Sequence, residues 1–433
     1  MGFMRGVAAV AAALALASAA EARPSPEEVL QLDTRLALEL TRHTPTTSPP
    51  VASRAFAYLY VAAYEAVAGG SGDLVSLAGQ LDGLEPLPPR EAGATYDEGV
   101  VLQAALSTAM ADLYSHTGPT GQRALTRMAE RLADGVADGV PPEVEERSRA
   151  QGEAVARHVL AWAEGDGGAV VENMGFPLAW DLPKGDGLWV PTSRIVQQQL
   201  PLLPRWGGNR TFAMPDGAAC PLPPPPAYST EPGSAFMAEA EEVLDARRGL
   251  TDEQRAIARF WSDDPMLTST PPGHWIAIAE QVLDAQDADA ERRVEVLARL
   301  SVAMADAFIG CWHEKFVYNY VRPVTVIKAQ LDPTFEPLLI TPPFPEYPSG
   351  HSTQSAAAAV VLTAMFGEDF AFTDASHEDD GLPARSFPSF EAAAEEAAMS
   401  RLYGGIHFRS AIEQGLAQGR CVGAYAVALR TRP

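Results

Sequence analysis

The sequence predicts an all-α protein, a large helical bundle with long Pro- and Gly-rich loops. Apolar residues recur at helical spacing through most of the 433 residues, strand signals are weak, and Gly, Pro and Thr separate the periodic segments. Hydrophobic residues make up 47% of the chain, which is enough for a large core. The predicted helices are residues 26–42, 51–69, 97–115, 119–137, 142–164, 234–248, 251–261, 274–287, 290–328, 350–366, 389–403 and 408–428.

Residues 165–234 interrupt the helical pattern. They open with four residues that include three glycines and contain the proline run 223–226. We interpret them as an irregular segment that wraps the helices or borders a site, with a mobile linker as the alternative. The predicted organisation is an N-terminal helical part, 23–240, that contains this segment, and a C-terminal bundle, 241–433, continuous with it.

The first 22 residues have the pattern of a secretory signal peptide. Residues 1–5 carry a positive charge, residues 6–17 are apolar, and Ala20, Glu21 and Ala22 form an A-x-A cleavage site. The apolar run is too short to cross a bilayer of about 30 Å, and no later run reaches the roughly 20 residues of a transmembrane helix. We therefore expect an exported protein, periplasmic or extracellular, without a membrane span.

The charge balance excludes two classes of partner. The chain has 32 Lys and Arg against 56 Asp and Glu, a net charge of −24. An acidic surface repels nucleic acid and anionic membranes, so neither is an expected partner. The acidity also fits an ordinary solvated surface, but a chain of this charge that binds an anion must gather its cations locally.

The cysteines give a weaker signal. The chain has Cys220, Cys311 and Cys421. This odd, low number indicates neither a disulfide framework nor a metal–thiolate site. One disulfide is compatible with an exported protein, and the sequence does not indicate which pair forms it.

The first group of residues suited to anion chemistry is Lys315 and Arg322. Their spacing of seven is about two helical turns, which places them on one stripe of the predicted helix 290–328. An Arg supplies a planar donor fork for an oxyanion and a Lys supplies a point charge. Pro323 is expected to kink or end the helix. Two solvated cations on an amphipathic helix are the alternative.

The second group is Ser349, Gly350 and His351, at the start of a predicted helix. Ser349 can cap the helix, Gly350 lets the backbone approach a ligand, and free N–H groups of the first turn favour an anion. His351 could exchange protons with that anion near neutral pH. An ordinary helix cap followed by a surface histidine is the alternative.

The third group is Arg401 and His407, separated by the turn at Gly404 and Gly405. Arg401 lies at a predicted helix end and His407 opens the next helix, so both side chains can point to one place; a plain helix corner is the alternative. Together, the three groups supply three cations, a helix N-terminus and two histidines. We therefore predict that they converge on one tetrahedral oxyanion.

The order K-x6-R-P, P-S-G-H and S-R-x5-H resembles the signature shared by vanadium-dependent haloperoxidases and the type 2 phosphatidic acid phosphatase superfamily. The resemblance is closer to the haloperoxidases. Residues 341–351 resemble the loop that leads into their site, and residues 306–315 the helix before their lysine. Residues 260–263, 272–275 and 53–67 resemble segments of exported bacterial members.

This resemblance implies two packed helical bundles and a vanadate bound through His407, with no haem or flavin. The residues that would hold the vanadate oxygens are Lys315, Arg322, Ser349, Gly350 and Arg401. His351 would be the acid or base, and Lys315 would polarise hydrogen peroxide before a halide attacks it. Trp312 and Phe344 fall where the family places aromatics near the halide, although core packing explains them equally well. A small organic molecule would then be halogenated.

One position departs from the family pattern. The family usually has Asp four residues after the last histidine, where this chain has Ala411. That Asp would orient the His407 imidazole and raise its basicity. Our hypothesis is that Glu413 substitutes for it from the next turn.

Two other functions use the same residues. In an acid phosphatase, phosphate would be the substrate, His407 the nucleophile that forms a phosphohistidine, and His351 the proton donor to the leaving oxygen. An exported, non-catalytic anion-binding protein is the third possibility. The halide, the organic substrate and the oligomeric state do not follow from the sequence. His43, His116, His158, His313 and His377 are assigned surface or core roles, and His274 is left without a role.

Overall fold

The computed structural model describes residues 23–433, and the predicted signal peptide, residues 1–22, lies outside the described residues. The all-α prediction is confirmed, because residues 23–433 form thirteen α-helices and a single two-stranded sheet. The helices are α1 (Pro26–His43), α2 (Pro49–Ala68), α3 (Glu98–Leu113), α4 (Pro119–Ala137), α5 (Pro142–Glu164), α6 (Ala235–Arg248), α7 (Asp252–Phe260), α8 (Thr270–Ala285), α9 (Ala290–Tyr318), α10 (Pro323–Gln330), α11 (Gly350–Phe366), α12 (Phe390–Tyr403) and α13 (Arg409–Val427). Within the described range, no helix has both the length and the apolar character needed to cross a bilayer.

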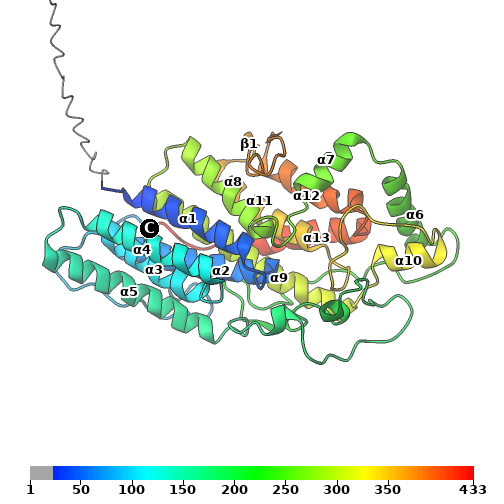
Figure 1. The fold of residues 1–433 in the computed structure, drawn as a ribbon, viewed down its shortest axis with the longest axis horizontal. Helices are drawn as coiled ribbons and strands as arrows, with labels where there is room; N and C mark the ends of the chain where they lie inside the picture. Colours follow the sequence, from blue (N-terminus) through cyan, green and yellow to red (C-terminus); the bar gives the residue numbers. More distant parts are fainter. Residues whose placement is uncertain (1–22) are drawn as a thin grey trace, which may run out of the picture.

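The helices form two groups that share α9. Helices α1 to α5 lie at one end of the molecule and α6, α7, α10, α12 and α13 at the other (Figure 1). The 29-residue α9 packs against α2 of the first group and against α11 and α13 of the second. The largest core cluster extends from Val29 in α1 to Leu429 beyond α13. Elements from both ends therefore contribute to one continuous apolar interior.

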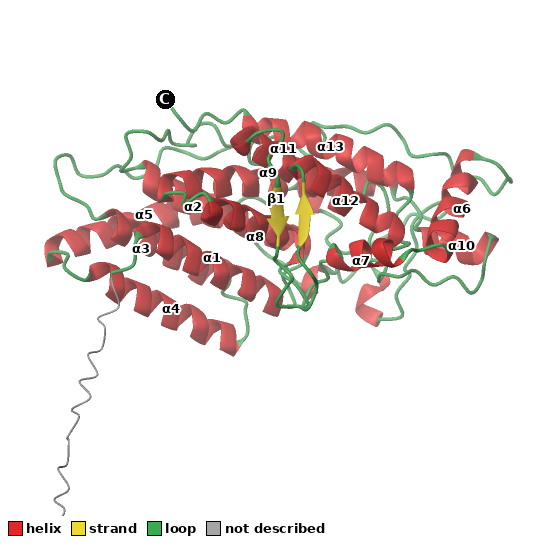
Figure 2. Ribbon diagram, turned by 90° about the horizontal axis from the view of Figure 1, so that it is seen from above, coloured by secondary structure: helices red, strands yellow, loops and turns green. Residues whose placement is uncertain are grey.

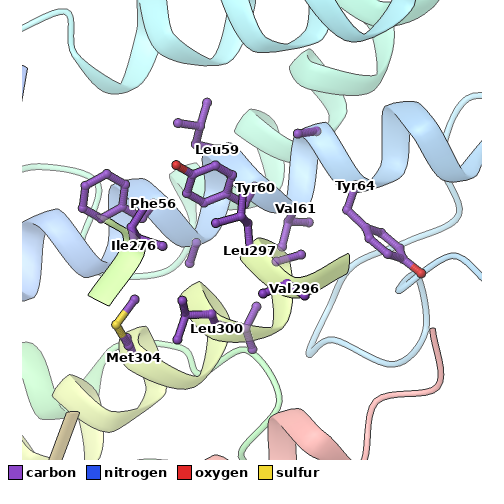
Figure 3. Close-up of a cluster of buried hydrophobic side chains, with 14 of the residues drawn as sticks. Phe56, Leu59, Tyr60, Val61, Tyr64, Ile276, Val296, Leu297, Leu300 and Met304 are labelled. Carbon is purple, nitrogen blue, oxygen red and sulfur yellow. The ribbon is translucent and has the colours of Figure 1, made fainter. Parts of the chain in front are cut away.

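The contact between α2 and α9 is apolar along its length. Phe56 and Tyr60 of α2 face Leu297 and Leu300 of α9, and Ile276 of α8 closes the cluster (Figure 3). All five side chains are fully buried. Burying an aliphatic or aromatic side chain of this size stabilises a fold by about 1.5–3 kcal/mol. This contact fixes the position of α9, whose last turn carries Lys315.

The predicted helix 290–328 is wrong as one helix. Asn319 adopts a left-handed conformation (φ 47°), and its N–H donates to the carbonyl of Lys315, which ends α9. Pro323 then occupies the first turn of α10, where a missing N–H costs nothing. Lys315 and Arg322 therefore do not share a helix stripe: Lys315 lies in the last turn of α9 and Arg322 caps the start of α10. The predicted helix 274–287 also begins earlier, at Thr270.

Residues 165–234 wrap the helices, as one of the two interpretations predicted. They contain three short 3₁₀ helices, η1 (Asn173–Gly175), η2 (Val196–Gln199) and η3 (Trp206–Gly208). The buried carboxylate of Asp306 in α9 accepts the backbone N–H groups of residues 212, 213 and 214 at 2.7–2.8 Å. A disulfide joins Cys220 to Cys421 in α13, and Cys311 is a buried free thiol. The segment is therefore anchored to the bundle rather than a linker.

Helix α13 approaches α11 closely because glycine lies at the contact. A Cβ on Gly419 would lie only 2.1 Å from the carbonyl oxygen of Thr353, and one on Gly415 would lie 2.8 Å from that of Ser349. Any larger residue would push the helices apart. This close approach sets the start of α13, which follows His407, beside the start of α11, which follows Ser349.

The small sheet is an antiparallel pair, β1 (Phe372–Asp374) and β2 (Arg385–Phe387). It packs between α8, which contacts β1, and α12, which contacts β2 (Figure 2). The aromatic rings of Phe372 and Phe387 face each other across the pair. This placement brings Asp374, at the end of β1, to the buried side of α8.

Candidate active site

Lys315 is fully buried at the end of α9, beneath the Pro-rich loop 341–349. Its ammonium group donates to the carbonyls of Pro345 and Glu346, each at 2.9 Å, and to that of Pro348. Burial, together with the nearby charge of Arg322, lowers the pKa of Lys315 to about 7. The three carbonyls hold the amine in one place and give its charge three acceptors.

Arg322 and Arg401 each keep a donor free. Arg322 donates from Nε to the Phe344 carbonyl at 2.9 Å and from Nη1 to the Ile406 carbonyl at 3.0 Å, and its Nη2 has no partner among residues 23–433. Arg401 donates from Nη1 to the Trp261 carbonyl at 2.7 Å, and its Nε is likewise unpaired within the described chain. Burial lowers the pKa of each guanidinium to about 10, so both stay cationic at neutral pH.

His407 is oriented by a donor on one side and a carboxylate on the other. Nη1 of Arg322 donates to its Nε2 at 3.2 Å, and Oε1 of Glu346 lies 2.8 Å from its Nδ1. Because a guanidinium only donates, Nε2 must accept, and the proton is on Nδ1. The lone pair of Nε2 therefore faces the cationic groups and can act as a ligand or nucleophile.

Contacts and charges from the three tracts act on His407. Burial lowers the pKa of His407 well below 6.5, and the charges of Arg322, Lys315 and Arg401 and the ring of His351 lower it further. The contacts agree: Arg322 donates to His407, and Glu346, whose backbone carbonyl accepts from Lys315, holds the other side of the same ring. The sequence patterns at 315–322, 349–351 and 401–407 are thus brought together in the fold.

Glu346 is a site residue that the sequence reasoning missed. It is fully buried, and its Oε1 also accepts the backbone N–H of Phe408 at 2.9 Å. Burial raises the pKa of Glu346 to about 8, against the lowering effect of Arg322 and Lys315. The hypothesis for Glu413 is wrong: that side chain is exposed and lies 3.9 Å from Arg409. The available signal was that Glu346 is the only charged residue in the loop 341–348.

The start of α11 has the predicted cap. Ser349 Oγ accepts the N–H of Ser352 at 3.4 Å, and the Ser349 N–H donates to the carbonyl of Ala411 at 2.9 Å. A Cβ placed on Gly350 would meet nothing closer than 3.8 Å. The protein's own packing therefore does not demand glycine there, because a Cβ would make only ordinary van der Waals contacts.

His351 borders the same cluster from the first turn of α11. Its Nε2 has no hydrogen-bond partner in the described part of the chain and lies 3.9 Å from Oδ2 of Asp263. Burial lowers the pKa of His351 well below 6.5, and the Arg401 charge lowers it further while Asp263 raises it. A neutral imidazole at this position can accept a proton from a group bound beside Arg401.

The unpaired atoms test whether a tetrahedral oxyanion such as vanadate fits. Nη2 of Arg322, Nε of Arg401 and Nε2 of His351 are all buried and lack partners among residues 23–433. Each unmet buried group costs about 1–3 kcal/mol. A bound oxyanion would satisfy them together, and the lone pair on His407 adds a ligand atom. The residues fit the group.

Comparisons with known proteins identify the family. A family model described as the VCPO second helical-bundle domain matches residues 295–433. The crystal structure described as the first bacterial vanadium-dependent iodoperoxidase is 40% identical, with a TM-score of 0.84, over 93% of this chain and 96% of that one. This chain belongs to the vanadium haloperoxidase family.

Two further structures of this vanadium haloperoxidase family extend the likeness of fold. The holo and apo forms of a bacterial vanadium-dependent chloroperoxidase are 16% and 15% identical, with TM-scores of 0.67 and 0.64. They cover 89% and 94% of this chain, and 92% and 95% of their own lengths are matched. At this identity the likeness shows the fold alone. None of the curated protein sequences matches the chain.

In this vanadium haloperoxidase, Trp312 and Phe344 form an aromatic wall beside the cations. Their ring centroids are 4.9 Å apart. The ammonium of Lys315 lies 5.2 Å from the Phe344 centroid, and the guanidinium carbon of Arg322 lies 5.0 Å from it. The indole N–H of Trp312 donates to the carbonyl of Leu202 in the wrapping segment. The wall keeps the cations out of water, which strengthens their pull on an anion.

A second cluster adjoins the first on the far side of His351. Both carboxylate oxygens of Asp263 lie 3.1 Å from Nδ1 of His274. Oδ1 of Asp263 also lies 3.4 Å from Nε2 of His377. Nε2 of His274 is 2.8 Å from Asp374, and Nδ1 of His377 is 3.1 Å from Asp380. From sequence alone, His274 has no assigned role and His377 only a surface or core role. His274 and Asp374 are 100 residues apart in sequence, and Asp263 and His377 are 114 apart, so periodicity cannot pair them.

Proposed function

We propose that this chain is a vanadate-dependent haloperoxidase that uses hydrogen peroxide to oxidise a halide. The observation that carries the proposal is the set of unpaired cationic donors around the accepting nitrogen of His407. The overall reaction is hydrogen peroxide, halide and a proton giving hypohalous acid and water. A small organic molecule would consume the hypohalous acid.

The protein's own groups would divide the work as follows. His407 Nε2 would be the ligand of vanadate, and its oxygens would be held by Lys315, Arg322, Ser349, Gly350 and Arg401. When bound, vanadate supplies Lewis-acid activation of the peroxide. Nε2 of His351 would accept a proton from the peroxide as it binds, and would return it to the leaving oxygen. Fixed cations stabilise the negative charge that develops on oxygen without reorganising.

Iodide is the halide we propose first. The relative that is 40% identical is described as an iodoperoxidase. Trp312 and Phe344 offer an apolar surface beside the Lys315 ammonium, which favours a large, weakly hydrated anion because that anion costs least to desolvate. We also propose that the protein is exported, on the strength of the signal-peptide pattern in residues 1–22 and the Cys220–Cys421 disulfide, since disulfides persist in oxidising compartments.

The test uses the purified chain with orthovanadate, hydrogen peroxide and either iodide or bromide. We expect halide oxidation that requires vanadate and falls at least about a hundredfold in His407→Ala, because the ligand nitrogen is lost. His43→Ala, at an exposed position on α1, is the matched control. Vanadate binding is measured separately by calorimetry.

The outcomes separate the rival functions. Hydrolysis of p-nitrophenyl phosphate without halide oxidation would indicate that the protein is an acid phosphatase. The same residues would then bind phosphate, and His407 would accept the phosphoryl group. Vanadate binding with neither activity would indicate the non-catalytic anion-binding protein. Oxidation that persists in His407→Ala would overturn the assigned ligand.

A further inference from the structure

We propose that Asp263, His274 and His377 bind a divalent transition-metal ion, with Zn²⁺ as the representative, next to the oxyanion site. One ligand atom from each residue lies within 4.8 Å of the other two. The inner nitrogens of the two histidines are 3.1 and 3.4 Å from the carboxylate oxygens of Asp263. Two ligands held at about 2.0–2.2 Å from a tetrahedral ion are roughly 3.3 Å apart, which matches these separations.

The outer nitrogens have the partners that metal-binding histidines use. Nε2 of His274 faces Asp374 at 2.8 Å, and Nδ1 of His377 faces Asp380 at 3.1 Å. A carboxylate on the outer nitrogen keeps the proton there and turns the lone pair of the inner nitrogen toward the metal. The outer carboxylates are themselves held, Asp374 by Ser376 and Asp380 by Arg42.

A buried nitrogen of His377 lacks a partner that a metal ion could supply. Nε2 of His377 has no hydrogen-bond partner within residues 23–433, although the residue is only 5% exposed and the atom faces Asp263. A buried imidazole nitrogen that is left without a partner costs about 1–3 kcal/mol. A metal ion between His377 and Asp263 would remove that cost.

The charges of the cluster allow one divalent ion. Three carboxylates, Asp263, Asp374 and Asp380, are opposed by Arg42, which leaves two negative charges. Two imidazolium protons or one divalent cation neutralise them equally, so binding of the ion would release two protons. The groups that face the cluster from its other side are His351, 3.9 Å from Asp263, and Arg401, which acts on Asp263 electrostatically.

The donor set selects the class of metal. Two imidazoles and one carboxylate suit zinc, iron, nickel or copper, whereas calcium and magnesium prefer oxygen ligands alone. Asp263, His274 and His377 are at most 5% exposed, which is typical of a structural rather than an exchanging site. A fourth ligand would be the second oxygen of Asp263 or a water.

The proposed ion would tie three elements together behind the active site. Asp263 follows α7, His274 belongs to α8, and His377 follows β1, whose hairpin lies beside α8 (Figure 2). The carbonyl of Trp261, two residues before Asp263, holds Arg401. Fixing this loop would therefore position Arg401 and His351. This last step rests on the proposed function, whereas the metal site itself does not.

The experiment measures metal on the full chain in the absence of vanadate and peroxide. The protein is purified without an affinity tag, equilibrated with micromolar Zn²⁺, desalted and examined by elemental mass spectrometry. We expect about one zinc per chain, with affinity at least about a hundredfold lower in His377→Gln. His116→Gln is the control, because His116 is an exposed histidine outside the cluster that contacts Thr47. Chelation should lower the melting temperature of the wild type and leave that of His377→Gln unchanged.

A measurement on the wild type guards against a variant that does not fold. X-ray absorption at the zinc edge should show two imidazole ligands with the remaining ligands oxygen. Zinc content below about a tenth per chain, or equal content in wild type and a folded His377→Gln, would overturn the proposal. The cluster would then be a protonated histidine–carboxylate network. Because no halide chemistry is involved, this failure is distinct from failure of the proposed function.

Discussion

Two buried polar clusters lie on either side of His351, and they carry opposite excess charge. Around His407, the cations Lys315, Arg322 and Arg401 face one carboxylate, Glu346. Around His274, three carboxylates face one arginine. The first arrangement leaves donors without acceptors, and the second leaves acceptors that need cations. Charge balance, more than residue type, therefore decides which ligand each cluster can hold.

The pKa values of His407 and His274 differ for the same reason. Burial lowers the pKa of both rings, but the cations around His407 lower its pKa further, well below 6.5. At His274 the carboxylates Asp263 and Asp374 outweigh burial and raise the pKa to about 10. His407 is therefore a neutral ligand at pH 7, and His274 without a metal is a cation.

Removing positive charge from the first cluster should have the largest effect. Arg401→Met keeps the apolar stem but deletes the buried guanidinium and its unpaired Nε. We expect vanadate affinity to fall by about a hundredfold to a thousandfold, because truncating a buried charged partner costs about 2–5 kcal/mol. Calorimetric titration with vanadate measures the change.

A matched variant separates this local charge from net charge. Arg409→Met removes a surface guanidinium that pairs with Glu242 and should change vanadate affinity by less than about twofold. If Arg401→Met also binds vanadate within about threefold of the wild type, excess cationic charge does not define the first cluster.

The carboxylate of the first cluster should have the next largest effect. Above about pH 8, where the Glu346 carboxyl is ionised, Glu346→Gln keeps an acceptor for the Nδ1 proton of His407 but removes the charge that makes the ring a better ligand. We expect vanadate affinity to fall by about 10- to 100-fold. Glu413→Gln alters only the exposed pairing with Arg409 and should leave the affinity unchanged. The reverse ranking in vanadate titrations would restore Glu413 to the role that the sequence suggested.

The sequence predicted local features well because they depend on neighbours in the chain. Ser349 caps α11 as its residue type and position indicate, and Arg401 and His407 flank the predicted glycine turn. The break after α9 was missed, although Asn319 and Pro323 are a helix stop and a helix start. The helical spacing of apolar residues continues across Asn319 and Pro323, so the pattern predicted one helix where the structure has two.

Pairings distant in sequence could not be predicted. Glu346 meets His407 across 61 residues, and His274 meets Asp374 across 100. Neither contact leaves a periodic trace, because each depends on how separate elements pack. The resemblance implies an Asp at position 411, where this chain has Ala411, and the acid nearest to that position in sequence is Glu413. The fold instead supplies Glu346, from a loop on the other side of the ring.

A third buried carboxylate differs from those of both clusters, because burial alone shifts its pKa. Asp33 in α1 is 2% exposed, and its Oδ2 is unpaired within residues 23–433. Burial raises the pKa of Asp33 to about 7. The native state therefore binds more protons than the unfolded state between about pH 4 and pH 7, and the contribution of Asp33 to stability falls as the pH rises through that window.

Asp33→Asn should remove this pH dependence. At pH 8 we expect the variant to be more stable than the wild type by about 1–2 kcal/mol, part of the roughly 4 kcal/mol that three pKa units represent, because the buried amide also lacks partners. At pH 4 the advantage should vanish, since Asp33 is then neutral. Denaturant unfolding at both pH values measures the difference, with Asp73→Asn, an exposed position, as the control. Equal stability of Asp33→Asn and the wild type at pH 8 would mean that burial alone does not neutralise a carboxylate in this core. The contrast between the two clusters would then need a cause other than charge balance.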